Sequence, residues 1–332
     1  MSSPALYLRI LCAFVFALFA QAAMALNING VEYVGVNEFA RMAGMKYKTV
    51  VRGKKMRVFS KWQSIAFEVN SRASKINGVY VNLGHPVAVK NGLLYVSKRD
   101  VYKNIYPVVF PAILKNARKP THIVIDAGHG GKDDGAKNSK YNIKEKSINL
   151  DVALKLGAIL RKMGYKVSYT RTKDVYVDLE MRPIIANRRN ADLFISIHSN
   201  STGTKSVSGA ETYALTPVWL PSSSSSRLRA GDGVKYPGNN TDNWSQYLSY
   251  SIQKSLLERT GADDRGARRA RFAVLRTTNM PACLVEIGFL SNNAECLKLA
   301  TPSYRLKIAN AIANGIVRYE SAVKNAASRS RR

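Results

Sequence analysis

The sequence predicts an α/β protein with an open, twisted mixed sheet in three layers, helices covering both faces, preceded by a small α+β domain. Two observations predict this fold. Between residues 121 and 323, short apolar segments typical of buried strands alternate with amphipathic segments typical of helices. Between residues 26 and 106, short segments of alternating apolar and polar residues are separated by turn residues. The length of 332 residues is sufficient for two domains.

The first 25 residues have the pattern of a secretory signal peptide. Arg9 is their only charged residue, residues 10–19 are apolar, and residues 23–25 (Ala-Met-Ala) match a cleavage site. The alternative is an uncleaved membrane anchor, but the apolar run is short for a span. No other segment is a candidate span. After cleavage we therefore expect an exported protein without a stable membrane span, located in the periplasm or in the cell wall and extracellular space.

Residues 26–106 carry the signals of the small α+β domain. Asn-Gly pairs at residues 77–78 and 91–92 each predict a tight turn between two strands. The clearest strand-like segments are residues 55–59 and 79–83. The clearest helical segments are residues 36–44 and residues 97–102, and the second of these begins with a serine cap. Residues 107–120, with three prolines and three basic side chains, predict a linker to the next domain.

Residues 121–323 predict the large domain. The clearest helix is at residues 145–163, where apolar side chains recur every three or four residues until Gly164. The expected strands are residues 123–125, 166–170, 193–197, 209–215, 272–275 and 282–287. The other expected helices are residues 179–189, 244–259, 293–300 and 303–323.

Two further segments lack periodicity. Residues 216–243, which include five consecutive serines, predict a long loop that is either a substrate-binding lid or a plain insertion. Residues 324–332, rich in Arg and Ser, are expected to form a basic disordered tail. Cys283 and Cys296 could form a disulfide in an exported protein, but both lie in apolar patterns that favour two buried thiols.

The chain is strongly basic, with a formal net charge of +29. Positive charge is densest in residues 26–120, which hold 17 Lys and Arg against 4 Asp and Glu. Such a surface favours polyanions, and for an exported protein these are cell-wall polymers, other anionic envelope polymers and anionic lipid surfaces. Nucleic acid is not expected as a partner. The alternative is that the charge serves solubility alone.

Residues of metal-ligand or acid–base type lie at the ends of predicted strands. His129 lies in IVIDAGHGG, His198 in DLFISIHSN and Glu286 in CLVEIGFLSN. Because open α/β sheets bind ligands beyond the carboxyl ends of their strands, we expect these side chains at one edge of the sheet. Glu145 opens the helix at 145–163 on the face turned toward the sheet, where the helix dipole favours a carboxylate. Each residue alone could be structural, but together they predict a mononuclear metal site.

Two histidines and a carboxylate with an open fourth position suit catalytic zinc, so we predict one Zn²⁺ per chain, held by His129, Glu145 and His198. Bound zinc would lower the pKa of its water to about 7 and polarise a scissile carbonyl. Glu286 would be the catalytic residue that takes the proton from this water and passes it to the leaving amine. The glycines around His129 would let the backbone turn and leave space for a substrate.

Three other chemistries fit the sequence less well. A phosphate-binding loop at Lys132 lacks the P-loop spacing and the Ser or Thr after the lysine. The helical two-histidine zinc site requires an HExxH stretch, which does not occur. A cysteine nucleophile needs a neighbouring histidine, and Cys283 lies within an apolar strand.

The segment from about residue 121 to residue 319 resembles the zinc-dependent N-acetylmuramoyl-L-alanine amidases of the type 3 family. The resemblance implies that His129, Glu145 and His198 are zinc ligands and that Glu286 is the catalytic glutamate. The motifs that carry it are IDAGHGGKDDGA, the helix start at residues 145–150, TRTKD, ADLFISIHSNS, GAETY, ARFAVLR and PACLVEIGFLSNNAE.

The family hydrolyses the amide between N-acetylmuramic acid and L-alanine of the stem peptide. The resemblance therefore implies a peptidoglycan hydrolase of cell-wall remodelling or daughter-cell separation, with peptidoglycan as its partner. Asn200, in a His-x-Asn pattern, would line the site. Some members carry an inhibitory helix after the strand that corresponds to residues 209–215, whereas the serine-rich segment here has no helical pattern.

Two alternatives remain open. A zinc carboxypeptidase or endopeptidase acting on stem peptides would use the same ligands, and a non-catalytic wall-binding protein would keep the site without activity. Glu286 beside all three ligands disfavours the second.

Residues 26–106 resemble the copper amine oxidase N-terminal-like stalk domains, through the segments VGVNEFARMAG, SKINGVYVNL and GLLYVSKRDV. His85 is their only histidine, so we infer no copper site and hypothesise a wall-tethering role.

Overall fold

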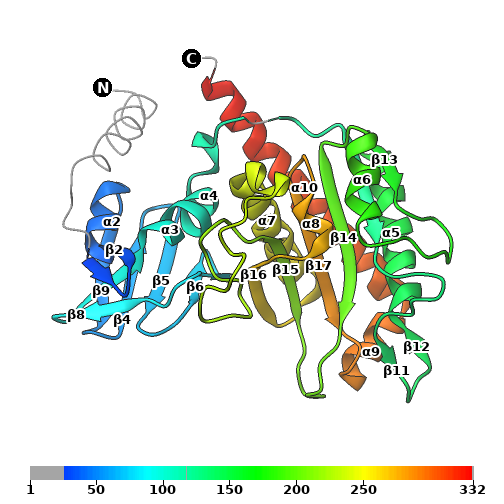
Figure 1. Cartoon of the computed structure of the whole chain (residues 1–332), viewed down its shortest axis with the longest axis horizontal. Helices are drawn as coiled ribbons and strands as arrows, with labels where there is room; N and C mark the ends of the chain where they lie inside the picture. The colour runs from blue at the N-terminus through cyan, green and yellow to red at the C-terminus, as the bar shows by residue number, and fades with distance from the viewer. Residues whose placement is uncertain (1–25, 117, 331–332) are drawn as a thin grey trace.

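The computed structural model describes residues 26–116 and 118–330 (Figure 1). The signal peptide expected at residues 1–25 lies outside them. Figure 1 shows a smaller N-terminal part, coloured blue to cyan, beside a larger part in which helices lie against a long sheet. Within the described residues, no helix combines the length and the apolar character needed to cross a membrane.

One sheet of eleven strands runs through both parts, in the order β13-β10-β14-β17-β15-β16-β7-β6-β5-β4-β3. The strands of the larger part are β10 (His122–Ala127), β13 (Lys166–Tyr169), β14 (Leu193–Asn200), β15 (Ala210–Leu215), β16 (Asp264–Ala270) and β17 (Ala282–Phe289). Neighbouring strands β13, β10, β14 and β17 are parallel, whereas β15 is antiparallel to β17 and parallel to β16. The mixed sheet predicted from the sequence is confirmed.

Helices cover both faces of these strands. Ile123 and Ile125 of β10 pack into a core shared with α5, α7, α9 and α10, whereas Val124 packs on the opposite face with residues of α6 and α8. Burial on both faces explains why four of the six residues of β10 are apolar. The three-layer fold is therefore confirmed. The helices are α5 (Glu145–Lys162), α6 (Met181–Arg188), α7 (Asp242–Thr260), α8 (Ala273–Arg276), α9 (Asn293–Ala300) and α10 (Pro302–Ser330).

Two expectations for the larger part were wrong. Residues 272–275, expected as a strand, include the first residues of the helix α8, and the strand is instead the preceding segment DRGARRA of β16. Its charges conceal the strand, because Arg269 is buried and bonded to backbone carbonyls rather than exposed. The disordered tail expected at 324–332 is helical through Ser330, since Ala326 still packs into the core. Cys283 and Cys296 are both buried and free.

The N-terminal part contains a second, four-stranded sheet. Both Asn-Gly pairs form the expected two-residue turns, with positive φ at all four residues. The four-stranded sheet has the order β1 (Leu26–Ile28), β2 (Val31–Gly35), β9 (Leu93–Ser97) and β8 (Ala88–Lys90). The strands that extend the long sheet are β3 (Lys46–Val51), β4 (Lys55–Phe59), β5 (Ser64–Glu68), β6 (Ala73–Ile76) and β7 (Val79–Asn82). Helices α2 (Val36–Met42) and α3 (Lys98–Asp100) occur where the sequence predicts them.

The two parts are packed together rather than joined by a free linker. β7 pairs with β16, and the backbone N–H of Tyr80 donates to Asp264 Oδ2 at 2.7 Å. A π-helical segment (Val101–Ile105) and α4 (Tyr106–Val109) lead into the expected linker. Its first residues are buried in the core that α7 shares with the N-terminal part, and a 3₁₀ turn follows at Pro111–Ile113.

The serine-rich segment 216–243 lies far from the predicted site. It begins at the carboxyl end of β15, and because β15 is antiparallel to β17, this end lies at the opposite edge of the sheet from Glu286. The segment packs against the N-terminal part, where the Arg72 guanidinium donates to the Ser222 carbonyl at 3.1 Å. The structure therefore favours an insertion, ending in a 3₁₀ turn at Pro237–Thr241, over a lid.

Candidate metal centre

The predicted metal ligands converge at the carboxyl ends of the parallel strands. His129 follows β10, Glu145 is the first residue of α5, and His198 lies near the end of β14. One ligand atom from each lies within 4.8 Å of the others. Glu286 of β17 is the register partner of His198, so it lies on the neighbouring strand at the same height.

The three side chains fit a tetrahedral metal. Glu145 Oε1 lies 3.2 Å from His129 Nε2 and 3.1 Å from His198 Nδ1. A tetrahedral zinc site with ligand distances of about 2.0–2.1 Å has edges of about 3.3 Å. The Glu145 carboxylate is held in place, because Oε2 accepts from the Ala136 N–H at 2.8 Å and Oε1 from the Ser199 N–H at 3.0 Å. The donor set and its spacing therefore suit zinc.

The loop after β10 orients His129. The backbone angle φ of His129 is 62°, and φ is also positive at the two glycines that follow it. His129 Nδ1 donates to Asp133 Oδ2 at 2.8 Å, which turns Nε2 toward Glu145. Gly128 must be a glycine, because an added Cβ would lie 2.3 Å from Cε1 of the His198 ring. Thus the glycines leave space for the ligands themselves.

Burial and neighbouring charged or hydrogen-bonded groups shift three pKa values in the site. Burial alone would raise the pKa of Glu145, but the hydrogen bonds and charges of both histidines hold it far below its usual range. Burial lowers the pKa of His129, but its bonds to Glu145 and Asp133 outweigh this and raise it overall. Burial, with the negative charges of Glu145 and Glu211, raises the pKa of Glu286 well above its usual value.

Glu286 has the environment of a reactive group. The residue belongs to the buried strand β17 and is only 9% exposed. Within the described part of the chain, its Oε2 atom has no hydrogen-bond partner. A buried carboxylate oxygen without a partner is costly, so its place beside the three ligands calls for a reacting partner.

Sequence reasoning missed Glu211. This residue of β15 is the register partner of Glu286 on the other side of β17. Its Oε1 accepts from Tyr213 Oη at 2.9 Å and from Nδ2 of Asn200 at 2.8 Å, which places Asn200 beside this acid. The available signal was an acid inside the apolar strand AETYAL, which is the same anomaly that singled out Glu286.

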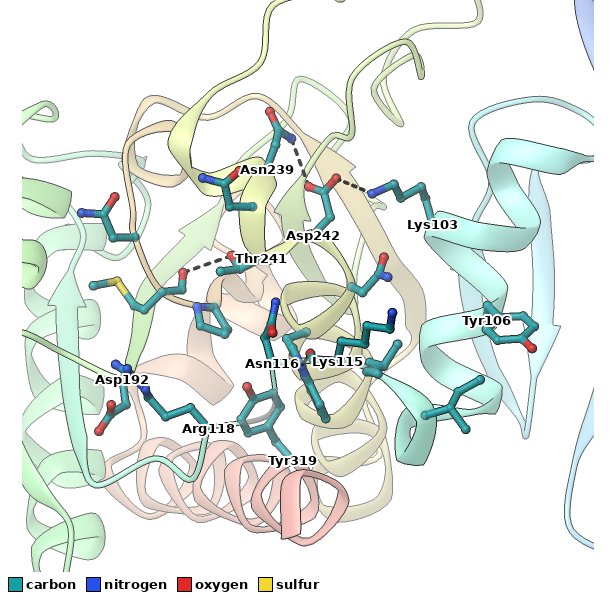
Figure 2. Close-up of a pocket in the computed structure, with 18 of the residues that line it drawn as sticks. Lys103, Tyr106, Lys115, Asn116, Arg118, Asp192, Asn239, Thr241, Asp242 and Tyr319 are labelled. Atoms are coloured by element: carbon teal, nitrogen blue, oxygen red, sulfur yellow. Dashed lines mark hydrogen bonds and ion pairs between the residues drawn. The ribbon is translucent and has the colours of Figure 1, made fainter. Parts of the chain in front are cut away.

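A cavity of about 830 Å³ lies elsewhere, at the amino ends of the strands (Figure 2). Arg118 and Asp192 line it just before β10 and β14, and Asp242 lines it from the start of α7. In Figure 2, Lys103 points from the N-terminal part toward Asp242, with which it pairs at 3.1 Å. No predicted site residue lines this cavity, so the reactive groups and the cavity occupy opposite edges of one sheet.

The fold and the side-chain group together define a class: three-layer α/β proteins with a candidate catalytic metal site at the carboxyl ends of parallel strands. The sequence profile of the N-acetylmuramoyl-L-alanine amidases matches residues 123–318. The chain belongs to this family. The enzyme class expected from the sequence is thereby confirmed.

Individual relatives agree. The chain is 34% identical over 258 residues to the N-acetylmuramoyl-L-alanine amidase AmiC of Neisseria meningitidis, covering 70% of this chain and 61% of AmiC. It is 36% identical over 197 residues to the protein YqiI of Bacillus subtilis, covering 59% of this chain and 84% of YqiI. The crystal structure of N-acetylmuramoyl-L-alanine amidase from Clostridium difficile 630 is 33% identical with a TM-score of 0.51, covering 61% of this chain and 97% of that one. The match thus spans about three fifths of AmiC.

Proposed function

We propose that this protein is a zinc enzyme that hydrolyses the amide between N-acetylmuramic acid and L-alanine of peptidoglycan. The observation that carries the proposal is the unpartnered Oε2 of Glu286 beside the His129–Glu145–His198 group, in a chain of the amidase family. One zinc ion per chain would be held by His129 Nε2, Glu145 Oε1 and His198 Nδ1.

In this mechanism the bound zinc would polarise the scissile carbonyl and lower the pKa of the attacking water. Glu286 Oε2 would accept the proton of that water and deliver it to the leaving nitrogen of L-alanine. Glu145, once its charge is bound to a divalent cation, would no longer raise the pKa of Glu286. Burial and Glu211 would still raise this pKa, but the ionised form of Glu286, which is needed to accept a proton, would be easier to reach than without the cation.

We further propose that the protein is exported and acts in the periplasm or the cell wall. The net charge of +29 supports contact with peptidoglycan and with other anionic envelope polymers. A wall-tethering role for residues 26–106 stays a prediction. Deleting these residues would expose the buried Ala267 of β16, so point changes of exposed lysines test tethering better than truncation.

The variant Glu286→Gln tests the assigned base. We expect zinc content to stay near that of the parent, because Glu286 is not a ligand, while hydrolysis of purified peptidoglycan falls by about 10²–10⁴-fold. Metal analysis and a dye-release assay measure the two effects. The matched control is Glu258→Gln, an exposed acid of α7 that pairs with Arg318, and it should behave like the parent. If Glu286→Gln digests peptidoglycan as well as the parent does, the assignment is wrong.

A further inference from the structure

A row of polar side chains crosses the sheet beside the candidate metal centre. His198, Glu286 and Glu211 are register partners on the neighbouring strands β14, β17 and β15. They lie on one face, because residues an even number of positions away, such as Phe194 and Leu284, pack into the core under α6 and α8. A substrate bound across this face would therefore meet the three side chains in sequence.

Two arginines of β16 continue the row. Arg265 Nε donates to Glu211 Oε2 at 3.3 Å, and Arg268 Nη1 donates to the same oxygen. Aromatic rings support both guanidinium groups, which lie 4.9 Å from the Phe289 ring centre and 5.5 Å from the Tyr213 ring centre. The two arginines are thus held at defined positions.

The charges of this cluster do not balance. Two guanidinium groups share one carboxylate, Glu211, whose other oxygen is already bonded to neutral groups. Arg268 Nε is buried and, among the described residues, without an acceptor. The side chains of Arg265 and Arg268 are nevertheless 33% and 20% exposed, so both reach the surface. A purely structural ion pair with Glu211 would need only one arginine. The second arginine adds a positive charge, and its remaining N–H donors are available to a ligand.

We propose that Arg265 and Arg268 bind a carboxylate of the substrate's stem peptide and so determine substrate specificity. The inference rests on the proposed function. Guanidinium groups present forked N–H donors that match a carboxylate. In the proposed substrate the carboxyl group of muramic acid is consumed in the scissile amide, so a carboxylate recognised here must belong to the peptide.

The spacing of the strands locates this carboxylate along the peptide. β16 lies two strands from β17, which at about 4.8 Å per strand places the arginines about 10 Å from Glu286. An extended peptide advances about 3.3 Å per residue. The arginines therefore match a carboxylate on about the third residue beyond the scissile amide.

Two synthetic substrates test the inference. Both are N-acetylmuramoyl tripeptides that begin with L-alanine, and they differ only in a carboxylate or a carboxamide on the third residue. For the parent we expect kcat/KM to be about tenfold to a hundredfold higher with the carboxylate, mainly through KM, because charge-assisted hydrogen bonds are strong. Arg268→Gln should remove most of this preference. Arg265→Gln, at the more exposed position, should do the same and decides the question if Arg268→Gln does not fold.

The control is Arg318→Gln, which removes an exposed arginine of α10 and should keep the parent's preference. If the parent cleaves both substrates with equal kcat/KM, the carboxylate subsite is wrong while the amidase function stands. If the parent cleaves neither, the proposed function fails and the inference fails with it. If the arginine variants lose kcat equally on both substrates and keep the preference, the arginines are structural and the inference is overturned.

Discussion

The two edges of the long sheet differ in the chemistry of the side chains that they carry. At the carboxyl edge, ligand atoms of His129, Glu145 and His198 lie within 4.8 Å of one another, and glycines leave space for these side chains. Glu286 lies on the neighbouring strand, and its buried Oε2 has no partner within the described residues. At the amino edge lies a cavity of about 830 Å³, in which Asp242 is already paired with Lys103 and bonded to Asn239 (Figure 2). The comparison teaches that a paired acid such as Asp242 can line a large cavity without being a candidate reactive group. We expect reactivity instead where an acid with a shifted pKa, such as Glu286, also has an oxygen without a hydrogen-bond partner.

Removing a metal ligand should produce the largest difference between the edges. His198→Ala removes one of the three proposed ligands, so we expect loss of bound zinc. Activity should fall by more than about 100-fold, the upper end of the losses that changes around ligands produce. Asn240→Ala, an exposed residue at the amino-edge cavity, serves as the control and should leave both unchanged. Zinc by mass spectrometry and peptidoglycan hydrolysis are the measurements. Equal losses of zinc and activity in the two variants would contradict the proposed difference between the two edges of the sheet.

A smaller effect is expected from the acid that orients His129. Asp133→Asn keeps the shape but removes the charge that holds Nδ1, so zinc affinity should fall by about 10–100-fold. Competition with a chromogenic chelator measures this affinity. The matched change at the other edge is Asp242→Asn, for which we expect unchanged zinc affinity. Parental zinc affinity in Asp133→Asn would show that the histidine is held by its backbone alone.

The smallest effect tests tight packing at both edges. Gly128→Ala and Gly238→Ala would each place a Cβ 2.3 Å from a neighbouring atom, His198 Cε1 and the Leu275 carbonyl oxygen respectively. We expect both to lower the free energy of unfolding by about 1–3 kcal/mol. Only Gly128→Ala should also weaken zinc binding, because it displaces a ligand ring. Denaturant unfolding together with zinc titration separates the outcomes, and weaker zinc binding in both variants would contradict the account.

Much of the site follows from the sequence because parallel strands deliver their ends to a common edge. His129, His198 and Glu286 end or follow apolar runs, and Glu145 opens an amphipathic helix, so their meeting could be predicted from local patterns. Sequence patterns also predicted the Asn-Gly turns and the helix at 145–163, because these depend on local backbone preferences.

The remaining features depend on partners far apart in the chain. The charges of β16 look unlike a strand until Arg268 is paired with Glu211, 57 residues away. The antiparallel direction of β15, which places segment 216–243 at the far edge, has no local signal. The pairing of β7 with β16, which merges the two parts into one sheet, likewise depends on tertiary contacts. These contacts explain why local patterns misjudged the strand at 272–275 and left a lid and a plain insertion undecided for residues 216–243.

The central claim is that the carboxyl edge holds one zinc ion and cleaves the bond between muramic acid and L-alanine. Metal analysis of the purified protein, paired with mass spectrometry of the products released from purified peptidoglycan, tests it most directly. The account predicts one zinc per chain, loss of activity on chelation with recovery on adding zinc, and intact free stem peptides that begin with L-alanine. Shortened stems that remain attached to the glycan, or undiminished hydrolysis after the metal is removed, would contradict it.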